Sequence, residues 1–199
     1  MDIALIGSRW LGAEVLAGLL QRGHRVTVVA TDPDDRLARA AAAAGLPLTL
    51  LEGRRRVKPE DVPGEVDLIV AAHSHAFIPA EVRAKARLGA IGYHPSLLPR
   101  HRGIAAVEWT ILSGDKVAGG SVYHLADEMD GGPVAAQEEV AVEPGEDAAS
   151  LWRRALGPMG VRMLLAVIDE AARTGHIAAR DQDPAGVTFA PAIRQPTGA

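Results

Sequence analysis

The sequence has no cysteine, no long apolar run and no excess of basic charge. The lack of cysteine excludes disulfide scaffolds, cysteine-ligated zinc, iron–sulfur clusters and cysteine nucleophiles. The 21 basic and 25 acidic residues give a net charge of −4, which argues against general nucleic-acid binding through phosphate neutralisation. No segment reaches the roughly 18 apolar residues of a membrane span, and the start of the chain lacks the basic region of a signal peptide. We therefore expect a cytoplasmic protein without membrane or general nucleic-acid partners.

The length and composition indicate one globular domain. The chain has 199 residues, of which 48% are hydrophobic and 23% charged, and these values are typical of a single folded domain. We expect the domain to span residues 1–199, with an irregular surface tail from about residue 181, where proline and glycine are frequent.

Short apolar runs alternate with segments of helical periodicity in the first half of the chain. The pattern predicts strands at 3–6, 25–30, 46–51 and 67–72, and helices at 11–20, 34–44 and 79–86. Nearly continuous apolar strands that alternate with helices are typical of a parallel sheet covered on both faces. The predicted fold class is therefore α/β, a Rossmann-like three-layer sandwich with a mostly parallel central sheet.

The second half of the chain has a different pattern. Strands are predicted at 90–93, 119–125 and 134–142, of which the later ones can be antiparallel, and a helix at 105–112. A long helix is predicted at 148–173, with a break at Gly157-Pro158. Its apolar residues suffice to pack it on its own sheet, so it does not indicate a dimer, and the sequence leaves the oligomeric state open.

Five of the seven histidines lie in segments that follow predicted strands: His73, His75, His94, His101 and His124. Because open parallel sheets bind ligands at the carboxyl ends of their strands, we expect these segments to converge there. His94 stands at a strand end before a proline, and Asp130 stands before two glycines that allow a close backbone approach. The pair His94 and Asp130 is therefore the candidate for acid–base catalysis, against the alternative that these residues are structural.

Three other kinds of site compete with this interpretation. Three histidines with an aspartate can bind zinc, but no HxH lies in a predicted strand and no HExxH on a helix, so we expect no metal. The first turn, from Gly7 to Gly12, lacks the second glycine of a dinucleotide fingerprint and carries the bulky Trp10. Ser96 lacks the GxSxG motif of a nucleophilic hydrolase. The remaining histidines can be ordinary loop residues, a solvated basic turn at His101 among them.

The run YHPSLLPRHRG over 93–103, followed by Asp130, Gly132 and Gln137, resembles the folate-dependent formyltransferase superfamily. Further matching segments are FIP at 77–79, GD at 114–115 and GVTFAP at 186–191. The motif is similar to those of methionyl-tRNA formyltransferase catalytic domains. The tyrosine before the histidine most closely resembles the hydrolase domain of 10-formyltetrahydrofolate dehydrogenase.

The resemblance implies 10-formyltetrahydrofolate as formyl donor, with His94 and Asp130 as catalytic residues. It places the folate at a set of loop residues: Ala72, His73, Ser74, His75, Leu98, Leu125, Ala126, Asp127 and Glu128. It places the acceptor or the oxyanion near Gly92, Tyr93, Arg102 and Gly103. The asparagine that the transferases carry two positions before the histidine falls on Gly92. Its loss should lower the rate unless a water, His73, His75 or Tyr93 replaces it, and the sequence leaves open whether any of them does.

The implied reaction is transfer of a formyl group from this donor to an amine acceptor. One alternative is hydrolysis of the same donor to formate, and another is a folate-binding domain without catalysis. The presence of both His94 and Asp130 argues against the second alternative, because binding alone requires neither.

Overall fold

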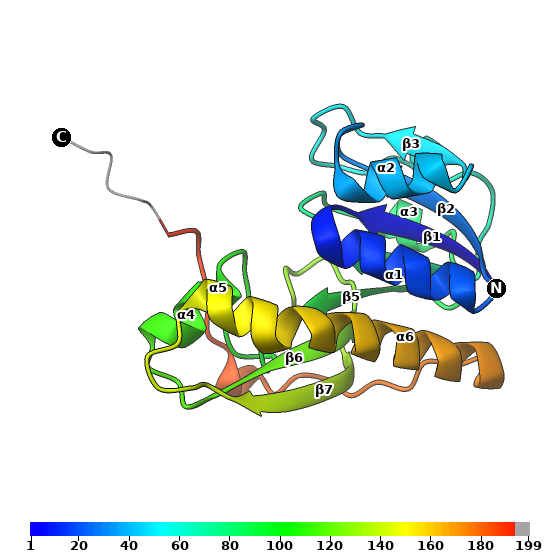
Figure 1. Cartoon of the computed structure of the whole chain (residues 1–199). Helices are drawn as coiled ribbons and strands as arrows, with labels where there is room; N and C mark the ends of the chain where they lie inside the picture. The colour runs from blue at the N-terminus through cyan, green and yellow to red at the C-terminus, as the bar shows by residue number, and fades with distance from the viewer. Residues whose placement is uncertain (194–199) are drawn as a thin grey trace.

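Within residues 1–193, which the computed structural model describes, seven strands form one sheet in the order β3-β2-β1-β4-β5-β6-β7 (Figure 1). Five neighbouring strands are parallel: β1 (Asp2–Gly7), β2 (Arg25–Ala30), β3 (Leu48–Leu50), β4 (Leu68–Ala72) and β5 (Ala90–His94). The last two, β6 (Val117–His124) and β7 (Val134–Ala141), are antiparallel to their neighbours. The predicted α/β fold with a mostly parallel sheet is confirmed.

One face of the sheet is covered by α1 (Arg9–Gln21), α2 (Arg36–Ala43) and α6 (Gly157–Thr174), which lie in front of it in Figure 1. Their apolar sides and the strands form the larger core, in which Leu5, Leu16 and Leu164 are fully buried. On the other face, α3 (Ala80–Arg83) and the segment 51–66 cover the parallel strands around Ile6 and Ile69. Burial of these continuous apolar strands on both faces supplies the main driving force for the fold.

Two predicted helices differ in detail from the pattern. The helix expected at 79–86 ends at Arg83, because the next backbone groups pair with Val66 across a short bridge instead. The break expected at Gly157-Pro158 is a π-helical turn (Trp152–Leu156) between α5 (Ala148–Leu151) and α6. Proline has no amide hydrogen for the helical ladder, and a wider turn accommodates it without ending the helix.

The second face of β5 and β6 is covered by loops rather than by α3, and this face carries the site described below. Leu98, Tyr123 and Val134 form a small apolar cluster on it. Residues 177–191 are largely irregular, but they pair with other parts of the chain. They return along the site loops through bridges between Arg180 and Val134 and between Phe189 and Arg102. A further α-helix, α4 (Ala106–Leu112), follows the loop 95–105.

Candidate active site

His94 is the last residue of β5 and is 6% exposed. Its Nε2 atom lies 2.8 Å from the carbonyl oxygen of His101. A carbonyl oxygen only accepts hydrogen bonds, so this nitrogen carries a proton in both charge states of the ring. The other nitrogen, Nδ1, is therefore the atom of His94 that can gain or lose a proton.

The carboxylate of Asp130 faces this second nitrogen. Its Oδ2 atom lies 3.6 Å from His94 Nδ1 and accepts a hydrogen bond of 2.8 Å from the Gly103 amide. Its Oδ1 atom accepts a hydrogen bond of 2.6 Å from the Tyr123 hydroxyl. A separation of 3.6 Å is longer than a hydrogen bond, so a reacting group or a water can bridge the two side chains. The arrangement suits proton transfer at the space between His94 and Asp130.

The two catalytic candidates come together, but not for the reason that the strand ends suggested. Because β6 is antiparallel to β5, its last residue His124 lies beside Ile91, near the amino end of β5. His124 therefore lies away from His94, so the third segment begins near the opposite ends of the strands from the place where we expected the segments to converge. Asp130 reaches the site because the loop 125–133 folds back over the face of the sheet to Gly103.

The acceptor-side residues divide into two groups. Gly92 lies on the face of His94, and an added Cβ there would contact Leu125, Ala71 and Tyr123. Tyr93 points to the opposite face: its ring packs on Gly120 and Gly160, and its hydroxyl donates to the Leu156 carbonyl at 2.7 Å. The expectation that Tyr93 serves the site is corrected by the alternation of side chains along a strand.

Arg102 and Gly103 hold the Asp130 loop. The guanidinium of Arg102 is 5% exposed and donates to Glu128 at 2.6 Å and to the Gln182 side chain at 2.8 and 3.1 Å. Each of its three nitrogens therefore bonds a group within the chain, and the expected contact with the acceptor stays a prediction. The Gly103 amide is likewise used by Asp130.

The loop after β4 brings His73 and His75 together, with ring centroids 5.0 Å apart. Ala72 ends the strand, and the hydroxyl of Ser74 bonds the backbone of Ala76. Burial lowers the pKa of His73 to about 4 and also lowers the pKa of His75, so both rings are neutral at pH 7. The Nε2 atom of His73 is buried, and no group within residues 1–193 hydrogen-bonds it.

The first turn of α1 is already occupied by a carboxylate. Both oxygens of Asp35 accept from the Arg9 amide, at 3.0 and 2.9 Å. Asp35 also accepts from Leu37 and so caps α2. Helix N-termini commonly bind anions, and here the anion is the carboxylate of Asp35.

The side chains of the loop 125–128 make contacts within the chain. Asp127 pairs with Arg83 at 2.7 Å, and Glu128 pairs with Arg102. Leu125 packs between two apolar clusters, and Leu98 lies buried against Tyr123. Ala126 lies close to Gly132, where an added Cβ would meet its side chain at 3.4 Å.

The model of the family described as formyl transferase matches residues 1–168. The chain belongs to the formyl transferase family. It is 37% identical to the mitochondrial 10-formyltetrahydrofolate dehydrogenase of Mus musculus over 95% of its own length and 22% of the dehydrogenase. It is 29% identical to the methionyl-tRNA formyltransferase of Lactobacillus delbrueckii subsp. bulgaricus, over 96% of the chain and 64% of that protein. The chain thus spans less than two thirds of these relatives.

A solved structure of the same fold is the N-formyltransferase from Helicobacter canadensis, in complex with folinic acid and dTDP-3-aminofucose. The TM-score is 0.80 at 14% identity, over 95% of this chain and 70% of that one. At this identity the similarity concerns the fold alone.

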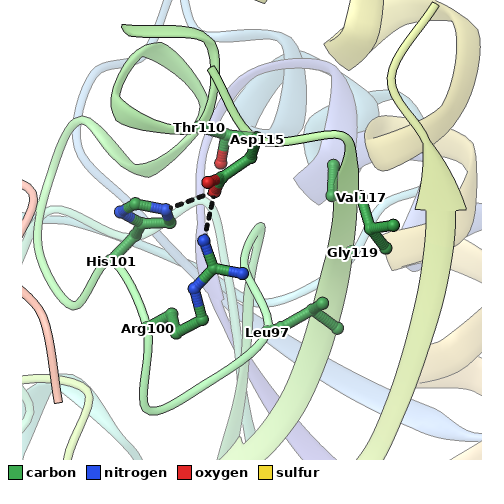
Figure 2. Close-up of a pocket in the computed structure, with 8 residues that line it drawn as sticks. Leu97, Arg100, His101, Thr110, Asp115, Val117 and Gly119 are labelled. Atoms are coloured by element: carbon green, nitrogen blue, oxygen red, sulfur yellow. Dashed lines mark hydrogen bonds and ion pairs between the residues drawn. The ribbon is translucent and has the colours of Figure 1, made fainter. Parts of the chain in front are cut away.

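In this formyl transferase domain, Asp115 of the GD motif binds the loop that follows His94. Figure 2 shows Asp115 between His101 and Arg100 in a shallow pocket. Its Oδ2 atom accepts from His101 Nε2 at 2.8 Å and from the Arg100 guanidinium at 2.6 Å. Burial alone would raise the pKa of Asp115, but these hydrogen bonds outweigh it and lower the pKa. His101 is therefore a buried anchor, not a solvated turn, and its carbonyl fixes His94.

Two residues of the site were not among the sequence candidates. Tyr123 binds Asp130, and Gln182 donates to the carbonyls of Asp130 and Gly132, both at 2.7 Å. Gln182 lies in the segment that we expected to be a surface tail. The glutamine of the motif, Gln137, bonds the Leu98 carbonyl at 2.9 Å. Of Tyr123, Gln182 and Gln137, only Gln137 could be predicted from the spacing of the sequence motif.

In residues 1–193, no three histidine, aspartate or glutamate side chains gather as metal ligands. In the same part of the chain, no helix combines the length and the apolar character needed to cross a bilayer.

Proposed function

We propose that this formyl transferase domain moves a formyl group from 10-formyltetrahydrofolate to an amine acceptor. The observation that carries the proposal is the pair of His94 Nδ1 and Asp130 Oδ2, 3.6 Å apart, with the other ring nitrogen fixed by a carbonyl. Formyl transfer needs a donor for a developing oxyanion and a group that exchanges protons, and this pair can supply both.

The residues support the following sequence of events. The amine nitrogen attacks the formyl carbon, and a tetrahedral intermediate with a negative oxygen forms. His94 in its protonated form donates from Nδ1 to this oxygen, and the Asp130 carboxylate lies beside the same nitrogen. Asp130 accepts the proton that the amine loses, directly or through a water. The oxyanion then reforms the carbonyl as the bond from the formyl carbon to the folate nitrogen breaks, and the proton held by Asp130 passes to that nitrogen, directly or through a water.

The donor is expected at the loops after β4 and β6. The Nε2 atom of His73, which is buried and has no hydrogen-bond partner in residues 1–193, can bond a polar edge of a heterocycle placed there. The acidic side chains of Asp127 and Glu128 are held by arginines, which leaves the backbone of this loop to face a ligand. The folinic acid in the Helicobacter canadensis enzyme agrees with a folate in this fold.

The acceptor is an amine by the chemistry of the reaction, and the sequence does not specify it further. The carboxylate of Asp35 on the Arg9 amide supports an acceptor that is not anchored by a phosphate at the start of α1. A cytoplasmic location and the lack of general nucleic-acid binding remain predictions of the sequence.

The test is a calorimetric titration with 10-formyltetrahydrofolate or a stable 5-deaza analogue, followed by turnover assays with and without amines. We expect binding at micromolar levels and release of tetrahydrofolate that depends on an added amine. His94→Ala should lower turnover by about 10²- to 10⁴-fold while donor binding persists. The matched control is His24→Ala, because His24 precedes β2 and so lies at the opposite end of the parallel strands from His94. Formate release at the full rate without amine would indicate hydrolysis instead, and absence of binding would overturn the proposal.

A further inference from the structure

We propose that Tyr123 is a positioning residue of this site, which holds the Asp130 carboxylate toward His94 and fills the space beside Gly92. The kinetic consequence rests on the proposed function, whereas the contact itself can be tested without it. Tyr123 does not belong to any motif by which the chain was related to its family.

The strand register places Tyr123 directly opposite Gly92. The two residues pair across β5 and β6, so that their side-chain positions share one face. An ideal Cβ at Gly92 would lie 3.5 Å from the Tyr123 ring and 3.0 Å from Leu125 Cδ2. The volume that a longer side chain at position 92 would take is therefore already filled from the neighbouring strand.

The Tyr123 hydroxyl is a permanent donor to Asp130. Burial raises the pKa of Tyr123 well above 10, and the negative charge of Asp130 raises it further, so the phenol keeps its proton at physiological pH. The hydrogen bond of 2.6 Å to Asp130 Oδ1 has the length typical of a hydroxyl bound to a carboxylate. With Oδ1 held in this way, Oδ2 is turned to the Gly103 amide and to His94.

The orientation of the phenol is fixed by packing. Tyr123 is 7% exposed and lies in the apolar cluster with Leu98 and Val134. Its ring meets the His94 ring edge to face, with centroids 6.4 Å apart. A side chain that is locked by its neighbours can hold a catalytic group at a defined angle. Tyr93, the other tyrosine, faces the opposite side of the sheet and cannot do so.

The kinetic test compares Tyr123→Phe with Tyr93→Phe, because both remove one buried hydroxyl and keep the ring. A hydrogen bond to a charged group, if it acts in the transition state, corresponds to about ten- to a hundredfold in rate. We expect Tyr123→Phe to lose that factor in kcat, with KM for the folate donor changed by less than about twofold. Tyr93→Phe should keep its kcat. Full kcat in Tyr123→Phe, or an equal loss in both variants, would overturn the positioning role.

The contact is tested separately by NMR of protein labelled with carbon-13 at tyrosine Cζ, which gives one signal for each of the two tyrosines. Asp130→Asn should move the Tyr123 signal and leave that of Tyr93 in place; an unmoved Tyr123 signal contradicts the inference. This measurement does not require Tyr123→Phe to fold. If the wild-type protein turns over no folate donor, the proposed function fails, and the NMR comparison still decides whether Tyr123 holds Asp130.

Discussion

Gly103 has a backbone conformation that favours glycine, and its amide also binds Asp130. Gly103→Ala tests whether the conformation of this residue matters for both stability and activity. Its backbone has φ +125°, a conformation that residues with a side chain rarely adopt. An added Cβ would lie 2.7 Å from the carbonyl oxygen of Ala190. The same residue donates its amide to Asp130 at 2.8 Å. The variant should therefore be less stable and should also disturb the Asp130 carboxylate.

The expected loss follows from two contributions. The strained backbone costs on the order of 1–3 kcal/mol. The contact with Ala190 cannot be relieved by a side-chain rotation, because its oxygen belongs to the backbone. A shift of Ala190 weakens its hydrogen bonds to Arg102 and Ala105, of 2.7 and 3.1 Å, each of which contributes about 1 kcal/mol. The total is about 2–5 kcal/mol in the free energy of unfolding.

The matched control is Gly145→Ala. Gly145 also has a positive φ, +76°, but no other atom of residues 1–193 lies within 4 Å of its added Cβ. It should lose only the left-handed strain of about 1–2 kcal/mol and keep full activity. Urea unfolding gives both free energies, and turnover of 10-formyltetrahydrofolate gives the activities. If the two variants are equally stable and equally active, the close approach of Gly103 to Ala190 is not a constraint on the site.

Two further substitutions test the supports around this centre. Gln182→Ala leaves the carbonyl of Asp130 without its amide donor, and it should lower stability by about 1–2 kcal/mol in urea unfolding and lower kcat as well; unchanged values would show that the segment 177–191 is dispensable. Burial lowers the pKa of His73 to about 4, so the stability that its neutral ring contributes is complete above pH 6.5 and is lost as the pH falls through 4. His73→Asn, which tolerates the left-handed backbone (φ +57°), should therefore show a smaller decrease in melting temperature between these two pH values, and a decrease equal to that of the wild type would contradict the reasoning.

Much of the fold follows from local patterns in the sequence. The parallel strands are short apolar runs, and their burial on both faces matches that pattern. His94 could be placed because a strand end followed by proline is a local feature. Asp130 could be predicted as a site residue because two glycines follow it, which indicates a tight turn. Its φ of +52° fits such a turn.

The residues that hold the site in place are far apart in the sequence, and no sequence spacing predicts their contacts. Gln182 and Asp130 are 52 residues apart, and His101 and Thr188, joined at 2.8 Å, are 87 apart. Composition indicated only that this part of the chain is irregular. The partner of Asp130 in β6 depends on the register between β5 and β6, which alternation alone does not set.

The change of strand direction after β5 explains why the site can exist on this face. The connection from β4 to β5 through α3 covers the second face of the sheet. A further parallel strand beyond β5 would need a right-handed crossover on the same face, and its helix would lie over His94. The antiparallel β6 needs no such crossover. It leaves the face to loops, and it brings Tyr123 beside Gly92, where its hydroxyl can reach Asp130. The departure from regular strand–helix alternation therefore explains two things: sequence patterns did not indicate Tyr123, and the sheet face is open to the proposed catalytic pair His94 and Asp130.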